Sequence, residues 1–219
     1  IGVCASSIAL ALGIAGDDDR QPKLLDGGDQ RRVEGCARET IPDEADAKHG
    51  RNVTFATMTE HIIRFDAESV RESWNRAAAS FDRAVASGLD YYRLEFFGPA
   101  QVEMCGDVRG MHLIDVGCGS GYFAREMARR GARVSGIDIS PGMIALAERH
   151  ETEAPLGIRY WVGDAADIVS HTGATVFDMA TSCMALQDMA DIPAVLRAVH
   201  DVLKPRGRFV ASITHPCTD

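Results

Sequence analysis

The sequence predicts an α/β fold, a doubly wound and mostly parallel sheet with helices on both faces. Three observations lead to this prediction. From residue 110 onward, short apolar runs alternate with segments of helical periodicity. Glycine and proline mark most of the changes between them. The composition is that of a globular protein, with 46% hydrophobic and 25% charged residues. Strands that alternate with helices form parallel sheets with right-handed crossovers.

Residues 58–109 are expected to form helices that precede the sheet and cover its site. Val70, Trp74 and Phe81 recur on one face of a helix that begins near residue 66. Two further short helices are predicted at 91–97 and 99–105.

Residues 110–219 are expected to form the sheet and its crossover helices. Helices are predicted over 122–130, after the cap Ser140, and after Asp191. The five predicted strands are 111–116, 133–139, 158–162, 175–181 and 208–213.

Residues 1–57 show no sustained helical or strand period, and we expect them to be a disordered or non-native extension. Their apolar start, 1–16, is shorter than the roughly 20 residues of a membrane span. It is also compatible with the apolar part of a signal peptide. At the other end the chain stops just after the fifth strand, so the edge of that strand is predicted to be unpaired.

Charge and cysteine content exclude several classes of function. With 23 basic and 32 acidic residues the formal net charge is −9, which disfavours broad binding to nucleic acid or to a membrane surface. The six cysteines include no C-x-x-C pair, so no metal site is predicted. They are interpreted as reduced thiols of a cytoplasmic protein. The sequence predicts no particular oligomeric state.

Acidic and small residues follow the predicted strands at the edge where ligands bind in such sheets. The first strand ends at Asp115 and leads into a loop with Gly117 and Gly119. The second ends at Asp138, and a carboxylate there can accept both hydroxyls of a ribose. The later strand ends carry Asp164, Ala165 and Ser182.

Four stretches in this order resemble the class I S-adenosylmethionine-dependent methyltransferases, in particular the small-molecule group called type 11. They read LIDVGCGSGYF, VSGIDISPGMI, GDA and LKPRGRFVASI. The resemblance implies a Rossmann-like sheet, here without its C-terminal strands, and S-adenosyl-L-methionine as cofactor. It implies that Asp115 holds the methionine ammonium and Asp138 the ribose hydroxyls. The other cofactor contacts that it implies are Gly117, Gly119, Ile139, Met143, Asp164, Ala165 and Ser182.

The function that follows is transfer of the cofactor's methyl group to a small-molecule acceptor by in-line displacement. Much of the acceleration in such a reaction can come from holding the reactants in position. Candidate acceptor contacts are Trp74, Tyr92, Arg93 and Gln187. His215 is a candidate base, because it follows the fifth strand. Whether the truncated chain is active is left open.

Two alternatives remain open at this stage. Gly119 to Ala124 formally matches the dinucleotide fingerprint, and Asp138 follows at a suitable distance, which would indicate an NAD-dependent oxidoreductase. Against it, the carboxylate of Asp115 precedes the glycines, where it would repel a pyrophosphate and attract an ammonium. The second alternative is a non-catalytic relic that binds the cofactor.

Overall fold

The computed structural model describes residues 7–13, 66–87, 91–174 and 176–214. Their strands form one sheet in the order β1-β6-β5-β2-β3-β4, in which β1 is antiparallel to β6 and the other five strands are parallel. The strands are β1 Ser7–Gly13, β2 His112–Val116, β3 Arg133–Asp138, β4 Arg159–Val162, β5 Phe177–Cys183 and β6 Leu203–Thr214. The predicted fold class, a doubly wound and mostly parallel sheet, is confirmed.

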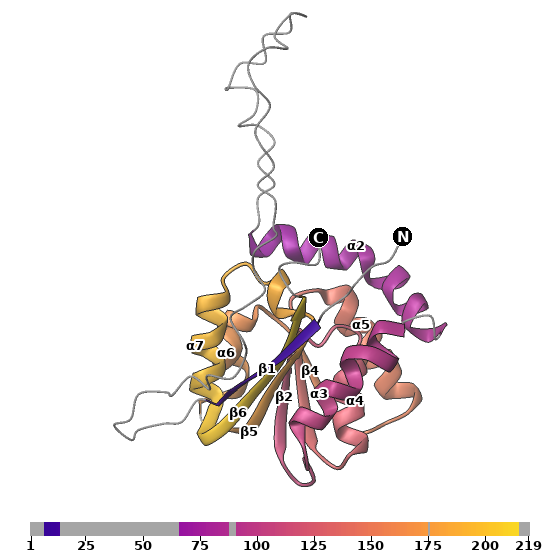
Figure 1. The fold of residues 1–219 in the computed structure, drawn as a ribbon. Helices are drawn as coiled ribbons and strands as arrows, with labels where there is room; N and C mark the ends of the chain where they lie inside the picture. Colours follow the sequence, from indigo (N-terminus) through magenta and orange to yellow (C-terminus); the bar gives the residue numbers. More distant parts are fainter. Residues whose placement is uncertain (1–6, 14–65, 88–90, 175, 215–219) are drawn as a thin grey trace, which may run out of the picture. The chain divides into compact units, whose positions relative to one another are not determined.

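Helices lie on both faces of the sheet (Figure 1). Two short turns, η4 Ala165–Asp167 and η5 Leu186–Asp188, follow β4 and β5, and a π-helical turn, η3 Tyr92–Phe96, precedes α3. The helices are α2 Ala67–Ala86, α3 Phe97–Cys105, α4 Tyr122–Arg129, α5 Pro141–Glu153, α6 Ile168–Thr172 and α7 Ile192–Val202.

The core consists of two layers, because successive side chains of a strand point to opposite faces of the sheet. On one face Leu113 of β2 packs with Phe123 and Met127 of α4. On the other face the next residue, Ile114, belongs to a cluster that includes Val199 of α7. Both faces are therefore covered, which is why the strands read as nearly continuous apolar runs.

Three of the predicted helix starts agree with the structure because a side chain caps each of them. Asp66 accepts a hydrogen bond from the Ser69 amide at 2.8 Å and begins α2. Ser140 caps α5 through the Met143 amide at 3.2 Å. Asp191 caps α7 in the same way.

Several boundaries differ from the predictions. The break expected around Pro99 is absent: the π-helical turn η3 runs directly into α3, and Pro99 lies in the first turn of α3, where helices tolerate proline. α6 was not predicted, because its five residues are too few for a helical period to show. β5 begins and ends later than expected. β6 begins earlier, at Leu203, with Arg206 in the left-handed region at φ 65°.

The edge of the fifth parallel strand is not open, contrary to the prediction. β1 pairs with β6 along its whole length, from Ser7 opposite Thr214 to Gly13 opposite Arg208. The backbone hydrogen-bonding groups of that edge therefore have a partner strand. Residues 7–13 form this strand, and the other residues of the predicted 1–57 extension lie outside those that the structure describes.

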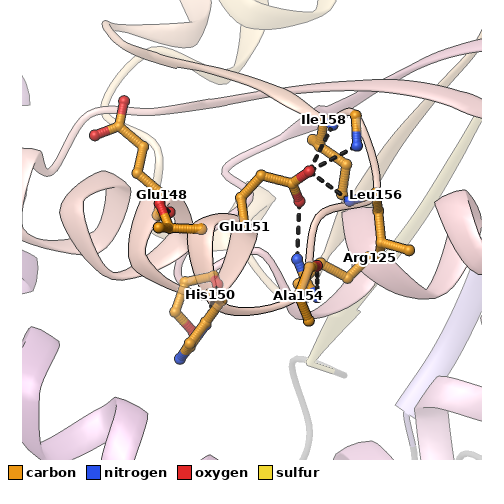
Figure 2. A network of polar contacts seen from close by, with 10 residues as sticks. Arg125, Glu148, His150, Glu151, Ala154, Leu156 and Ile158 are labelled. Atoms are coloured by element: carbon orange, nitrogen blue, oxygen red, sulfur yellow. Dashed lines mark hydrogen bonds and ion pairs between the residues drawn. The ribbon is translucent and has the colours of Figure 1, made fainter.

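A buried ion pair fixes the crossover from α5 to β4 against α4 (Figure 2). Glu151 Oε2 lies 2.8 Å from Arg125 Nη1, with side chains 17% and 8% exposed. Arg125 Nη2 also donates to the Ala154 carbonyl at 2.7 Å. The second oxygen, Glu151 Oε1, accepts from three consecutive backbone amides of the loop, at 2.5 to 3.2 Å. One carboxylate thus orders both the helix end and the loop that leads into β4.

Glu151→Ala should lower the free energy of unfolding by about 3 kcal/mol, because it leaves the Arg125 charge buried and three amides without an acceptor. Chemical denaturation of the two proteins measures the difference. Glu148→Ala is the matched control, since Glu148 is exposed on the same helix, and it should change stability by less than about 0.5 kcal/mol. Equal stability of Glu151→Ala and the parent would contradict the role given to this network.

Candidate functional site

A cavity of about 200 Å³ opens at the carboxyl ends of the parallel strands. Its walls come from the glycine loop after β2 and from the ends of β3, β4 and β5, and α2 contributes Ala67, Val70, Trp74 and Phe81. After β2 the chain continues to β3 and β4 on one side, and β5 lies on the other. The cavity therefore lies at the switch in strand order, where open α/β sheets bind ligands.

Asp115, near the end of β2, is buried with one oxygen satisfied and the other not. Its Oδ1 accepts from the Thr181 hydroxyl at 2.9 Å, and within the described part of the chain Oδ2 has no hydrogen-bond partner. Burial raises the pKa of Asp115 to about 7, against the opposing effects of the Thr181 hydroxyl, the Ala124 backbone amide and the Arg93 charge. A buried carboxylate oxygen of this kind needs a donor, and a cationic group in the cavity could supply one.

The glycine loop after β2 presents backbone atoms, without side chains, to the cavity. Gly117 and Gly119 have φ angles of 73° and 54°, in the left-handed region that side chains disfavour. A Cβ atom placed on Gly119 would meet no atom within 4 Å. On Gly117 it would collide with Ala185, at 2.6 Å from that residue's Cβ. The loop therefore needs glycine at 117 for packing, and at 119 it leaves an open approach for a ligand.

Asp138, at the end of β3, holds the loop in place. Its Oδ2 accepts from the Gly119 amide and its Oδ1 from the Ser140 amide, both at 2.9 Å. Burial raises its pKa, and these two amide hydrogen bonds oppose the shift. Each oxygen keeps a further lone pair that can accept from a ligand hydroxyl.

The far end of the cavity combines apolar and polar groups. Ile139, between β3 and α5, and Met143, in the first turn of α5, line it on one side, and Asp164 with Ala165 lines it after β4. Asp164 Oδ1 accepts from the Ala166 amide at 2.9 Å, which fixes the carboxylate at the start of η4. An aromatic ring with an exocyclic amine is a ligand of matching chemistry.

Arg93 enters the cavity from η3, between two aromatic rings. Its guanidinium carbon lies 4.8 Å from the ring centre of Phe81 and 5.1 Å from that of Tyr122. Trp74 packs edge-on against Phe81 with centres 5.7 Å apart. Among the residues that the structure describes, Arg93 is the one basic side chain that lines this cavity.

The structure brings most of the predicted site residues together. The cavity is lined by Asp115, Gly117, Gly119, Asp138, Ile139, Met143, Asp164 and Ala165, and also by Trp74 and Arg93. Ser182 does not line it. Its side chain is fully buried in the sheet and its carbonyl accepts from Gln101 Nε2 at 3.2 Å, while the next two residues, Cys183 and Met184, reach the cavity.

The acceptor-side predictions agree less well. Gln187 does not line the cavity, because its Nε2 donates back to the Met184 carbonyl at 2.7 Å. Its neighbour Asp188 lines it instead. Sequence reasoning missed Asp188, because no local pattern shows which of these two neighbours lines the cavity. The side chain of Tyr92 and all of His215 lie outside the described part of the structure.

The described residues include no group of three or more His, Cys, Asp and Glu side chains placed to hold a metal ion. Within the same residues no helix has both the length and the apolar character needed to cross a membrane.

Comparison with known proteins gives matches to methyltransferases. Residues 114–211 match a family described as a methyltransferase domain. Malonyl-[acyl-carrier protein] O-methyltransferase of Serratia marcescens is 31% identical over 155 residues, which cover 71% of this chain and 56% of the relative. Ubiquinone biosynthesis O-methyltransferase of Xanthomonas oryzae pv. oryzae is 36% identical over 107 residues, 48% of this chain and 44% of the relative. The chain spans about half the length of these curated relatives.

A solved structure supports the same fold. It is a chain in the complex between the Haloferax volcanii Trm112 methyltransferase activator and a methyltransferase. It matches with a TM-score of 0.54 and 23% identity, over 63% of this chain and 58% of that one.

The raised pKa of Asp115 predicts a pH-dependent stability of the free protein. Because the folded pKa, about 7, lies above that of an unfolded aspartate, the contribution of Asp115 to stability is fully present below about pH 4. It is lost as the pH rises through about 7. Asp115→Asn should therefore raise the melting temperature relative to the parent by about 5 °C at pH 8 and by much less at pH 5.

Thermal melts of both proteins at the two pH values make this measurement. A difference in melting temperature that does not change with pH would contradict the assignment of a shifted pKa to Asp115. Asp201→Asn, an exposed substitution on α7, controls for the general effect of removing one negative charge.

Proposed function

We propose, from the premise that residues 114–211 belong to the type 11 group of class I S-adenosylmethionine-dependent methyltransferases, that this protein transfers a methyl group to a small-molecule acceptor. The observation that carries the proposal is the buried, unsatisfied oxygen of Asp115, a residue that lines a cavity built at the ends of β2, β3 and β4. Two O-methyltransferases among the relatives support the same reaction class.

The residues present suit S-adenosylmethionine along its whole length. Asp115 would hold the ammonium, Asp138 the ribose hydroxyls, and Asp164 the exocyclic amine of the adenine. Ile139 and Met143 would flank the adenine ring. The open side of Gly119 would let the ribose approach the backbone. When bound, the cofactor supplies a methyl group on a positively charged sulfur, and the acidic lining suits that charge.

Arg93 has a second role open to it besides the acceptor contact predicted from the sequence. Its charge acts on Asp115 closely enough to oppose the rise in that residue's pKa. An α-amino acid carries an ammonium and a carboxylate on one carbon atom, so a neighbouring acid and base complement it. We assign Asp115 to the ammonium and Arg93 to the carboxylate of the cofactor's methionine part.

The protein's own contribution to the reaction is mainly position. Asp138 fixes the glycine loop through the Gly119 amide, and the cavity is lined on its other side by α2 with Trp74. A bound pair of reactants held in line would need little further rearrangement. The small-molecule class of the acceptor, the cytoplasmic location and the lack of nucleic-acid binding remain predictions.

The NAD-dependent alternative is not supported. The family match and the curated relatives are methyltransferases, and the orphaned oxygen of Asp115 would oppose a pyrophosphate at the glycine loop. The non-catalytic alternative makes the same binding prediction as the enzyme and differs from it in turnover.

Calorimetric titration distinguishes the two cofactors. S-adenosylhomocysteine should bind and stabilise the protein, by about 2.7 kcal/mol at a hundredfold excess over its Kd. NAD should show neither effect. Binding of NAD without binding of S-adenosylhomocysteine would overturn the proposed function. Methyl transfer from labelled S-adenosylmethionine to a panel of phenols, amines, thiols and carboxylates then separates an enzyme from a binding relic.

Arg93→Gln should weaken binding of S-adenosylhomocysteine about tenfold or more, because a charged hydrogen bond to the carboxylate is lost. It should leave binding of methylthioadenosine unchanged, since that nucleoside lacks the amino-acid part. The nucleoside therefore serves as the internal control for an intact site. Equal losses for both ligands would show that Arg93 supports the cavity through Phe81 and Tyr122 rather than holding the carboxylate.

A further inference from the structure

We propose that Asp188 marks the acceptor end of the cavity and accepts the proton that a neutral acceptor loses when it is methylated. The inference rests on the proposed methyl transfer. It names both a catalytic residue and a class of acceptor: a small molecule whose nucleophilic oxygen or nitrogen still carries a hydrogen atom.

Asp188 differs from the other acidic residues of the cavity in the hydrogen bonding of its carboxylate. Asp115 is bonded to Thr181, and Asp138 and Asp164 accept hydrogen bonds from backbone amides. In the described part of the structure the carboxylate of Asp188 has no hydrogen-bond partner, although the side chain lines the cavity and is half-buried. Both of its oxygens are therefore available to a ligand, whereas each of the other three carboxylates is already engaged by at least one hydrogen bond.

The turn that carries Asp188 is held firmly. Met184 adopts the left-handed conformation at φ 54°, and its amide donates to the carbonyl and the hydroxyl of Ser212, at 3.0 and 3.1 Å. The Gln187 side chain closes back onto the Met184 carbonyl, and the Asp188 amide donates to the Ala185 carbonyl at 3.0 Å. Met184 is a strained residue that several hydrogen bonds hold in place, and such residues are common at functional sites.

The turn also packs directly against the glycine loop. A Cβ atom added to Gly117 would lie 2.6 Å from Ala185 Cβ and 3.0 Å from Met189 Cε. Asp188 lies between these two residues in the chain. Its turn follows β5, on the opposite side of β2 from the adenine pocket after β3 and β4. This places Asp188 on the wall that faces the methionine–ribose junction, where the sulfur and its methyl group would lie.

The chemistry of this position suits a base. Burial raises the pKa of Asp188, which makes its carboxylate a better proton acceptor. In the step proposed, the acceptor oxygen or nitrogen forms a bond to the methyl carbon while the carbon–sulfur bond breaks, its electron pair remaining on sulfur. The hydrogen of the acceptor passes as a proton to Asp188 and then to water.

The same carboxylate selects among acceptors. A hydroxyl or an amine gains from a base that takes its proton, whereas a carboxylate acceptor has no proton to lose at neutral pH and would be repelled. We therefore assign the site to a neutral hydroxyl or amine compound in preference to a carboxylate.

Sinefungin tests the location of Asp188 without knowledge of the acceptor. This cofactor analogue carries an amine-bearing carbon in place of the methyl-bearing sulfur, so its ammonium projects where the transferred methyl group would project. Titration calorimetry should show that Asp188→Asn weakens sinefungin about tenfold while the affinity for S-adenosylhomocysteine stays within about twofold. Asp188→Ser should do the same, which protects the test against misfolding of one variant, and Asp201→Asn should change neither affinity.

The outcomes separate this inference from the proposed function. Unchanged sinefungin affinity in both Asp188 variants would overturn the placement of Asp188 while leaving the cofactor site intact. Failure of the parent protein to bind either ligand would overturn the proposed function itself. For the proton, the test uses the phenol or amine of the acceptor panel that the parent methylates fastest. Methylation of that compound by Asp188→Asn as fast as by the parent would overturn the role as base, and a loss of kcat with unchanged KM for the cofactor supports it.

Discussion

The carboxylate of Asp138 is the constraint on which the cavity depends. One of its oxygens fixes the Gly119 amide of the glycine loop, and the other fixes the Ser140 amide at the start of α5. A loop built from glycines with positive φ angles has little stiffness of its own. The bridge from the end of β3 holds it in one position, so a single acidic side chain sets the distance between the loop after β2 and the helix after β3.

α5 in turn fixes the position of α2, the helix that lines the cavity from the other side. At its start, the Gly142 amide donates to Asn75 Oδ1 of α2 at 2.7 Å. Near its end, Arg149 pairs with Asp82 of α2 at 2.6 Å. His150 lies between Asp82 and the carbonyl of Ser120 in the glycine loop, at 3.2 Å from each. α2 is thus docked at two places on α5, and the second of these also touches the loop.

The charged residues of the cavity have different roles in structure and in binding. Acidic side chains lie at the ends of β2, β3 and β4 and on the turn after β5, in keeping with a ligand rich in donors and positive charge. Arg93, the single basic group among the described lining residues, acts on the most buried of these acids, Asp115. Two of the acids are occupied by backbone amides and hold the walls as well as offering lone pairs. The carboxylate of Asp188 makes no such hydrogen bond to the described part of the chain. For that reason we assign it a catalytic role rather than a structural one.

The sequence by itself determined how strands and crossover helices alternate along the chain, and where Asp66, Ser140 and Asp191 cap helices. It also determined that Asp115, Asp138 and Asp164 meet at one edge of the sheet. Periodicity, capping and strand ends are local properties, and parallel strands bring their ends together whatever the details of packing. Tertiary structure alone decided that Ser182 is turned into the sheet, that Asp188 and not Gln187 lines the cavity, and that residues 7–13 pair with β6. Each of these depends on contacts between residues far apart in the chain or on a single left-handed residue, Met184, and no local pattern encodes either.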